Sequence, residues 1–431
     1  MGAGKTSAAI WHINHSEEKF LYCTPYLTEV DRILRECSAK RFFQPTTGKS
    51  GIGGKKYSLM NLMTKGYNVA TTHSLFGLMG AEAEDDEGER EQGDADVRID
   101  DNIISLAKGK YSLIIDEAYD VIQTTGIHKD DISTMIDAGL AEIKGGRLFV
   151  TEKGCEYKGT AYKEAISKIR ERTIVTYKEG EYTSLIYPPD TFDAFEDVYI
   201  LTYLFDGSVM QSYFDMSGLK YQRIGVRPVD DHYEFFDGET LLPNYVLDIK
   251  DKIEICDEPK LNGVGGVRDE SLSKNWYKNH IGDGGVDMLR RNHITFLHRC
   301  MVGKENSSLI MWTTFLKYKK DMTDWYASGK RFVSLGTKAT NMYANRRYLA
   351  FLANIFINPN LKITLWNMDV DVSEDVYALS SLVQWVWRSA IRNGEPIKIY
   401  IPSKRMRELF IGWLDDITAQ AAAQRVELAG V

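Results

Sequence analysis

Near the start of the chain stands the run Gly2-Ala3-Gly4-Lys5-Thr6. It matches the second half of the phosphate-binding loop pattern G-x-x-x-x-G-K-[ST]. Glycines let the backbone form a nest of N–H donors around phosphate oxygens, and a helix beginning at Lys5 directs the positive end of its dipole at the same anion. We therefore expect Gly2, Ala3, Gly4, Lys5 and Thr6 to bind the phosphates of a nucleotide, with the Thr6 hydroxyl as a Mg²⁺ ligand.

The position of this loop is unusual. The complete pattern would begin two places before Met1, and the strand that leads into such a loop is absent from the sequence. Two explanations are open: translation starts further upstream, which we favour, or the protein is a degenerate and inactive relative of loop-containing enzymes.

A second run, Leu113-Ile114-Ile115-Asp116-Glu117-Ala118-Tyr119, is an apolar strand that ends in an acidic pair. Nucleotide hydrolysis needs such a pair, one carboxylate to hold Mg²⁺ and one to activate the attacking water. We assign the first role to Asp116 and the second to Glu117. Because the pair follows the glycine-rich loop with a further strand between, the two runs together predict an ATPase that uses ATP and Mg²⁺.

The composition sets broad limits on the class of protein. The chain has 431 residues, 43% hydrophobic and 26% charged, which is typical of a globular enzyme with more than one domain. No apolar run reaches the ~20 residues that span a bilayer, and the first residues lack the pattern of a signal peptide, so we expect a cytoplasmic protein. The five scattered cysteines include no C-x-x-C pair, which argues against disulfides and structural zinc.

The net charge of −8 is concentrated in one segment. Residues 82–101 contain eleven acidic residues and two arginines, so the remainder of the chain is close to neutral. Such blocks are usually solvated loops. The overall charge therefore neither supports nor excludes a nucleic-acid partner.

Short apolar runs alternate with helical stretches in both halves of the chain, which predicts the α/β class with parallel sheets. Strands are expected at residues 19–23, 67–71, 111–115 and 197–203, and in the second half at 308–313, 331–335, 362–366 and 397–401. Helices are expected at 289–300, 343–357, 376–392 and from 403 onward. The predicted domains are 1–205, with the acidic loop 82–101 and a mostly helical insertion at 120–190, then a linker or insertion at 206–285, and a second domain at 286–431.

These motifs resemble, in order, those of the superfamily 2 (DEAD/DEAH-like) helicases, especially a type encoded by phages and other mobile elements. The similarity extends to Tyr22-Cys23-Thr24-Pro25-Tyr26 (motif Ia), Ala70-Thr71-Thr72-His73-Ser74, Ile200-Leu201-Thr202-Tyr203 (motif III), Met311-Trp312-Thr313-Thr314 (motif IV) and Gly336-Thr337-Lys338-Ala339-Thr340-Asn341 (motif V). The resemblance implies two RecA-like P-loop NTPase domains, with the first strand of the first domain missing through truncation. It also implies nucleic-acid contacts at Thr24, Thr72, Ser74, Thr313 and Thr340, and a role for Thr202 in coupling hydrolysis to movement. Hydroxyls at strand ends suit this role because they bind phosphates without reading the base sequence.

The run Gln384-Trp385-Val386-Trp387-Arg388-Ser389-Ala390-Ile391-Arg392 resembles motif VI, whose arginines reach the γ-phosphate across the domain cleft. On one helix, Gln384, Arg388 and Arg392 would share a face at i, i+4 and i+8. The spacing departs from the usual Q-x-x-G-R-x-G-R, so the two arginines could exchange roles. We expect Arg388 to make the γ-phosphate contact, with Gln384 and Arg392 completing the catalytic set.

The resemblance implies an ATP-dependent helicase or translocase that acts on DNA or RNA, with DNA favoured, in a bacterial host cell if the gene is phage-encoded. Phage replication proteins are the partners that it implies. Two alternatives are open. A terminase-like packaging ATPase would require a carboxylate cluster in a nuclease-like second domain, and a non-hydrolysing nucleic-acid adaptor would agree with the incomplete loop.

Overall fold

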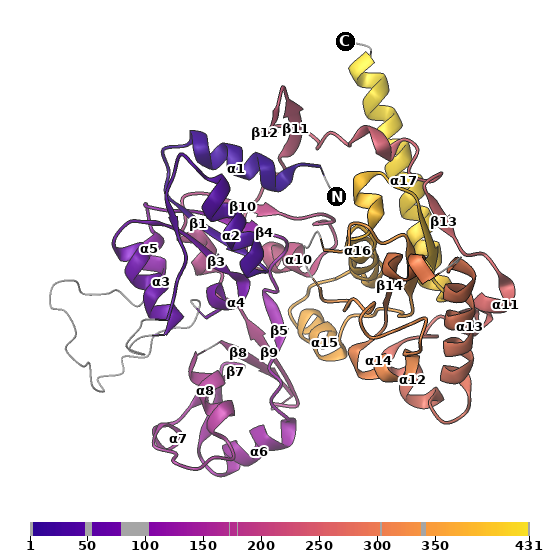
Figure 1. The fold of residues 1–431 in the computed structure, drawn as a ribbon. Helices are drawn as coiled ribbons and strands as arrows, with labels where there is room; N and C mark the ends of the chain where they lie inside the picture. Colours follow the sequence, from indigo (N-terminus) through magenta and orange to yellow (C-terminus); the bar gives the residue numbers. More distant parts are fainter. Residues whose placement is uncertain are drawn as a thin grey trace.

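The computed structural model describes residues 3–47, 54–78, 103–171, 173–178, 180–301, 304–337 and 342–429. The chain forms two α/β domains that lie side by side, and a smaller domain extends from the first of them (Figure 1). Each larger domain is built on a parallel sheet. The predicted α/β class with two parallel-sheet domains is therefore confirmed. The acidic segment 82–101, Gly2 and Thr340 lie outside the described residues.

The first sheet has its strands in the order β10-β4-β1-β3-β2, all parallel. They are β1 (Phe20–Thr24), β2 (Phe42–Phe43), β3 (Asn68–Thr72), β4 (Ser112–Asp116) and β10 (Val198–Leu201). Four of these, β1, β3, β4 and β10, confirm the strands predicted in this half of the chain. Every residue of β1 and β4 is buried, as expected where helices cover both faces of a parallel sheet.

Seven helices surround this sheet among the described residues. They are α1 (Lys5–His15), α2 (Leu27–Glu36), α3 (Lys55–Thr64), α4 (His73–Phe76), α5 (Ile103–Ala107), α9 (Asp190–Asp193) and α10 (Val209–Met216). Side chains of a strand alternate between the two faces. Accordingly Phe20 and Tyr22 pack with α1 and α2 on one face, whereas Leu21 and Cys23 pack with α3 and α5 on the other.

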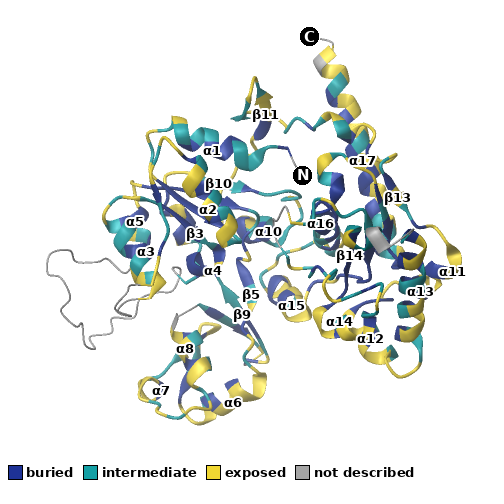
Figure 2. Ribbon diagram, viewed as in Figure 1, coloured by how far each residue is buried: buried dark blue, intermediate teal, exposed yellow. Residues whose placement is uncertain are grey.

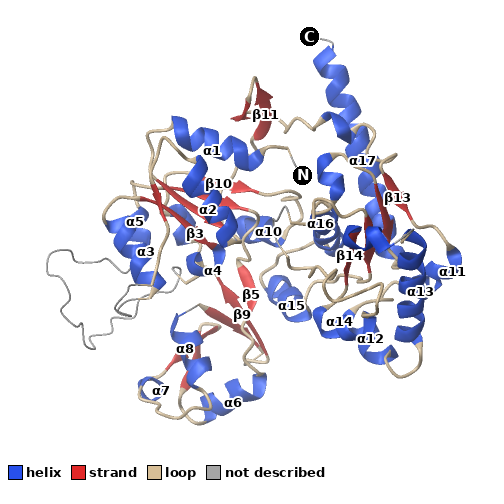
Figure 3. Ribbon diagram, in the orientation of Figure 1, coloured by secondary structure: helices blue, strands red, loops and turns tan. Residues whose placement is uncertain are grey.

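The insertion at residues 120–190 is not mostly helical, which corrects the sequence prediction. It contains the antiparallel sheet β5-β9-β8-β7-β6 as well as three helices (Figure 3). Its elements are β5 (Ile122–Thr124), α6 (Lys129–Asp137), β6 (Ala141–Lys144), β7 (Arg147–Val150), α7 (Glu152–Cys155), α8 (Lys163–Glu171), β8 (Ile174–Tyr177) and β9 (Tyr182–Ile186). The strands are only three to five residues long, and Gly145 and Gly146 form the turn between β6 and β7 with positive φ. A hairpin of this kind gives a weak pattern in the sequence.

The second sheet has the parallel order β13-β16-β15-β14. Its strands are β13 (Ile253–Ile255), β14 (Ile310–Thr313), β15 (Tyr348–Phe351) and β16 (Ile397–Tyr400). Since β13 pairs with β16, the second domain begins well before residue 286, and the predicted boundary there is wrong. Only the antiparallel hairpin of β11 (Gly225–Val229) and β12 (His232–Phe236), with its flanking segments, separates the two domains.

Two further predictions in this half are reversed by the structure. The expected helix at 343–357 contains strand β15, and the expected strand at 362–366 lies in helix α15 (Pro359–Asn367). The expected strand at 331–335 is reduced to a single bridge between Phe332 and Trp312. The side chain of Asn358 caps α15 and Pro359 occupies its first turn, and these signals outweigh the β-branched residues that follow.

The remaining helices cover the second sheet and bury its strands, as Figure 2 shows. They are α11 (Pro259–Asn262), α12 (Lys274–His280), α13 (Gly285–Cys300), α14 (Lys319–Met322), α16 (Glu374–Val386) and α17 (Lys404–Ala429), with 3₁₀ turns η1 (Asn244–Val246), η2 (Gly263–Gly266), η3 (Lys304–Leu309), η4 (Leu316–Tyr318) and η5 (Ala390–Asn393). Within the described ranges, no helix has the length and apolar character needed to cross a membrane.

Candidate active site

The glycine-rich run folds as predicted into the start of a helix. Gly4 has a φ of 81° and precedes α1, whose first two residues are Lys5 and Thr6. Ala3 is buried beneath this turn. The first-turn N–H groups of a helix have no partners within it, so they and the helix dipole form an anion-binding end. Ala3, Gly4, Lys5 and Thr6 thus surround a suitable place for a phosphate.

The acidic strand end lies directly beside this turn. The Thr6 hydroxyl donates to the Asp116 carboxylate, with oxygen–oxygen distances of 3.3 and 3.5 Å, although 110 residues separate the two. The Tyr22 hydroxyl, from the neighbouring strand β1, donates to Asp116 Oδ2 at 3.0 Å. Burial raises the pKa of Asp116 to about 6, helped by the negative charge of Glu117 and opposed by the hydrogen bonds from Tyr22 and Thr6. Tyr22 stands in the run that resembles motif Ia, but its bond to Asp116 was not predicted from the sequence.

Glu117 has an unusual backbone. Its φ is 66°, in the left-handed region that a non-glycine residue seldom adopts. The Glu117 N–H donates to the Leu201 carbonyl at the end of β10, with a distance of 3.1 Å. Such conformations cost about 1–3 kcal/mol and persist where the surrounding structure holds them, often at functional sites. The end of β10 therefore holds the turn that carries Glu117.

Lys5 completes the first-domain side of this cluster. Burial lowers the pKa of Lys5, while the negative charges of Asp116 and Glu117 oppose that shift. The ammonium lies 5.8 Å from the centre of the Tyr203 ring. Lys5 is therefore held beside two carboxylates and an aromatic face.

Arg388 reaches this cluster from the second domain. Its side chain is only 4% exposed, and its Nε and Nη1 have no hydrogen-bond partner among the described residues. Burial lowers the pKa of Arg388, and the nearby charge of Glu117 opposes the shift most strongly. A buried guanidinium without full pairing is costly. The negative charge of Glu117 thus favours the charged forms of both Lys5 and Arg388, which lie at opposite ends of the sequence.

The other two residues of the predicted motif VI set are placed differently. Helix α16 ends at Val386 and η5 begins at Ala390, so Gln384, Arg388 and Arg392 do not share one helical face, and that prediction is wrong. Gln384 donates to Ser380 of its own helix at 3.2 Å. Arg392 faces Glu29, whose charge opposes the effect of burial on its pKa. Of these three residues, Arg388 is the one whose charge interacts with that of Glu117.

A chain of aromatic residues connects the two halves of the site. Trp413 Nε1 of α17 donates to the Tyr203 hydroxyl at 2.9 Å, and Trp413 packs edge-on against Trp387, with 4.9 Å between ring centres. Trp387 precedes Arg388, and Tyr203 lies under Lys5. The hydroxyl of Thr202, predicted to act in coupling, donates only to the Tyr203 carbonyl at 3.4 Å. The observed interdomain link therefore involves Tyr203 rather than Thr202.

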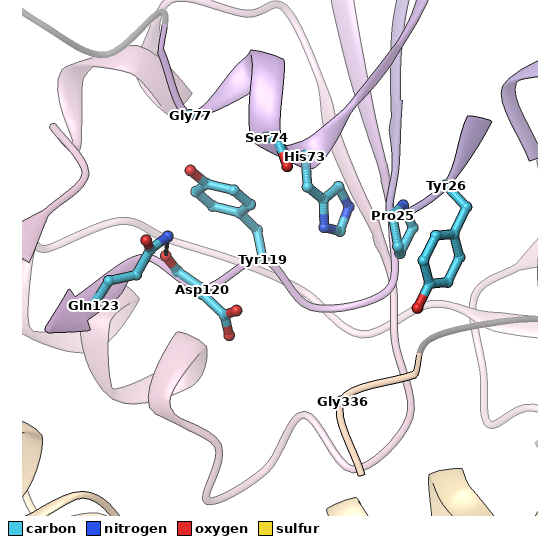
Figure 4. A pocket seen from close by; sticks show the side chains of 9 residues that line it. All are labelled: Pro25, Tyr26, His73, Ser74, Gly77, Tyr119, Asp120, Gln123 and Gly336. Carbon is cyan, nitrogen blue, oxygen red and sulfur yellow. Dashed lines mark hydrogen bonds between the residues drawn. The ribbon is translucent and has the colours of Figure 1, made fainter. Parts of the chain in front are cut away.

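A cavity of about 380 Å³ lies at the carboxyl ends of the first sheet, where it faces the second domain. Figure 4 shows its lining: Pro25, Tyr26, His73, Ser74, Gly77, Tyr119, Asp120, Gln123 and Gly336. Aromatic rings and polar side chains line it, and Gly336 is the one described lining residue that comes from the second domain. Such a surface provides rings for stacking and polar groups for hydrogen bonds.

The predicted nucleic-acid contacts divide into two groups. Ser74 is exposed at the cavity, and Thr72 caps α4 by accepting the Leu75 N–H at 3.4 Å. Thr24 and Thr313 also stand at strand ends, but both side chains are fully buried. An open strand end is thus found at β3, whereas the strand ends at Thr24 and Thr313 are enclosed in this structure.

The donor set fits Mg²⁺ together with a nucleotide. Thr6 and Asp116 offer hard oxygen ligands, which Mg²⁺ prefers, and its remaining positions are usually filled by phosphate oxygens and water. Across the described ranges, no group of three or more His, Cys, Asp or Glu side chains is placed to hold a metal ion by itself. The residues present therefore suit a metal that arrives with its phosphates.

Comparisons with known proteins give three kinds of match. Residues 247–414 match the family model of the YonV C-terminal Rossmann-like domain, a range that agrees with the early start of the second domain seen in the structure. The SPbeta prophage-derived uncharacterized protein YonV of Bacillus subtilis (strain 168) is 30% identical over 428 residues, which cover 96% of this chain and 97% of that protein.

Two solved structures are also similar. One, titled "Structure of S. tokodaii Xpd4", has 11% identity and a TM-score of 0.39, with 92% of this chain and 88% of that chain covered. The other, titled "XPD_Helicase", has 11% identity and a TM-score of 0.43, with 93% and 90% covered.

Proposed function

The chain belongs to the family of the prophage protein YonV, and we propose that it is an ATP-dependent helicase or translocase of the superfamily 2 type. In this proposal, ATP is hydrolysed between the two α/β domains and drives movement along nucleic acid, DNA rather than RNA. The observation that carries the proposal is geometric: the glycine-rich turn contacts the acidic strand end through Thr6 and Asp116, and the buried, incompletely paired Arg388 of the second domain lies near Glu117 of the same strand end.

In this proposal the first domain binds the nucleotide. The first-turn N–H groups of α1 and the Lys5 ammonium bind the phosphate oxygens, and Thr6 with Asp116 holds Mg²⁺. A Mg²⁺ ion held by these two residues would neutralise part of the phosphate charge. The hydrogen bond from Tyr22 favours the ionised form of Asp116, which is the form that binds a metal.

The chemical step requires a base and a stabiliser of the transferred group. Glu117 accepts a proton from the attacking water, and its strained backbone fixes the direction of approach. Arg388 contacts the γ-phosphate from the opposite domain, where its buried charge stabilises the transition state. Arg388 thereby gains the anionic partner that its burial requires.

In this proposal, movement follows from the loss of the γ-phosphate that Lys5 and Arg388 both contact. While ATP is bound, Lys5 and Arg388 contact the same phosphate and hold the domains together. After hydrolysis and phosphate release, the attraction across the cleft weakens, and the Tyr203–Trp413 bond transmits the change to α17. The strand would be held by backbone contacts at Thr72 and Ser74 and by the aromatic rings of the 380 Å³ cavity.

We expect ATP hydrolysis by the full chain to be stimulated by single-stranded DNA more than by duplex DNA or RNA. The measurement is phosphate release at saturating ATP and Mg²⁺ with each nucleic acid in turn, and Lys5→Ala serves as the negative control. Nucleic-acid binding without hydrolysis would contradict the proposal and favour the adaptor alternative. Metal-dependent cleavage of DNA by the chain would instead favour the packaging alternative.

A further inference from the structure

The β11–β12 hairpin lies directly on the phosphate-binding helix α1, between that helix and α17 of the second domain (Figure 1). It belongs to the part of the chain between the two sheets, for which the sequence indicated no role. Its side chains make specific ring contacts with α1 and with β10, the edge strand of the first sheet. These contacts suggest a function beyond that of a linker.

Two pairs of stacked rings attach the hairpin. His232 stacks on Trp11 of α1, with ring centres 4.7 Å apart and an angle of 6° between the rings. Phe235 stacks on Tyr199 of β10 at 5.7 Å and 11°, and its ring centre is also 5.8 Å from that of His12. Phe235 therefore bridges the phosphate-binding helix and the edge of the sheet. Aromatic pairs in such geometries stabilise a structure beyond simple burial.

A third contact reaches the phosphate loop itself. A Cβ atom placed on Gly4 would lie 2.3 Å from Cδ1 of Tyr233, so the tyrosine ring rests on the Gly4 backbone. Only glycine fits there, both because of this ring and because φ is +81°. Because the N-cap residue of α1 is a glycine, it has no side chain that could cap the helix. The direction of the first turn of α1 therefore depends on packing against the Tyr233 ring.

The other end of the hairpin is fixed to the second domain. Gln424 of α17 accepts the Leu242 N–H at 3.0 Å and donates to the Thr240 carbonyl at 3.0 Å. Arg425 donates to the Leu242 carbonyl at 3.0 Å. Thr240 in turn accepts the Val226 N–H of β11 at 3.2 Å. The hairpin is thus held by α17 and extends across to α1.

We propose that the β11–β12 hairpin is a clamp that positions α1, and with it Lys5 and Thr6, for nucleotide binding. Phe235 and Tyr233 are its positioning residues: they act through α1 and the Gly4 backbone. The nucleotide-binding part of this inference rests on the proposed function, whereas the clamping of α1 does not. Because hydrogen bonds attach the clamp to α17, the position of the phosphate-binding turn depends on the second domain even without a nucleotide.

Phe235→Ala tests the clamp, and Phe236→Ala is its matched control. Phe236 is the next residue of the same strand, but unlike Phe235 it does not belong to the hydrophobic cluster that includes α1, and its ring lies 5.3 Å from the guanidinium of Arg227. We expect Phe235→Ala to weaken the binding of the fluorescent nucleotide methylanthraniloyl-ATP by about two- to tenfold, the range that corresponds to the loss of one aromatic stack. Phe236→Ala should bind within about twofold of the wild type.

Amide hydrogen exchange without nucleotide supplies the second readout. Faster exchange confined to α1 is expected in Phe235→Ala and not in Phe236→Ala. Phe235→Leu keeps an apolar side chain but loses the stack, so it should give an intermediate effect, and it carries the test if the alanine variant does not fold.

The outcomes separate the two proposals. Unchanged exchange of α1 in both Phe235 variants, or equal changes in Phe235→Ala and Phe236→Ala, would overturn the clamp. If α1 is loosened in Phe235→Ala but even the wild type binds no nucleotide, the clamp stands and the proposed ATPase function fails. If the wild type binds and Phe235→Ala binds equally well, Phe235 does not position the phosphate-binding residues.

Discussion

Replacing Glu117 with glutamine is expected to leave ATP binding intact and to lower nucleic-acid-stimulated hydrolysis by about 10²–10⁴-fold. That range is the usual contribution of a general base. Glutamine has nearly the same shape as glutamate, so the turn at φ 66° and the N–H bond to Leu201 should remain. What is lost is the ability to accept a proton from the attacking water.

Phosphate release and methylanthraniloyl-ATP binding, measured on the same preparation, separate these effects. Asp31→Asn is the matched control, because this exposed carboxylate of α2 belongs neither to the candidate active site nor to the lining of the 380 Å³ cavity. The control should hydrolyse ATP at close to the wild-type rate. Undiminished hydrolysis in Glu117→Gln would show that another group activates the water.

Replacing Arg388 with methionine should reduce hydrolysis by about 10³–10⁵-fold, the range known for arginine fingers. Methionine retains an apolar stem of similar length and removes only the charged end. Because the guanidinium is buried and incompletely paired, its removal should leave the thermal stability of the apo protein unchanged or raised. A merely structural arginine would give the opposite result, a less stable protein.

Arg392→Met is the comparison for this variant. Arg392 is the nearest equivalent in the sequence motif, but its charge faces Glu29 on α2 and not the acidic pair of β4. Its loss should change hydrolysis much less than the loss of Arg388. The assignment is contradicted if the two variants lose equal activity, or if Arg392→Met loses more.

The positions of β1, β3, β4 and β10 in the first domain were predictable because each is a short apolar run that ends in polar residues. Burial on both faces removes alternation, so β1 and β4 read as continuous hydrophobic segments. The same property misled the prediction for residues 343–357, where strand β15 has the apolar density of a buried helix. In α15, the capping residues Asn358 and Pro359 were the better signal.

Within the candidate site, the sequence identified the residues whose role depends on local pattern. Lys5, Thr6 and Asp116 follow from a loop and a strand end, and the structure brings Thr6 and Asp116 into contact. Tyr203 and Trp413 could not be predicted, because their hydrogen bond joins residues 210 positions apart. A lone aromatic residue carries no sign of such a distant partner, and the same holds for Phe235 in the hairpin.

The central claim is that Lys5 and Arg388 bind the same triphosphate. Its most direct test is a crystal structure of the full chain with Mg²⁺, ADP and beryllium fluoride, which imitates the γ-phosphate. We expect the fluoride within hydrogen-bond distance of both the Lys5 ammonium and the Arg388 guanidinium, with Mg²⁺ beside Thr6 and Asp116. A nucleotide bound elsewhere, or one bound at α1 while Arg388 contacts no part of it, would contradict the claim.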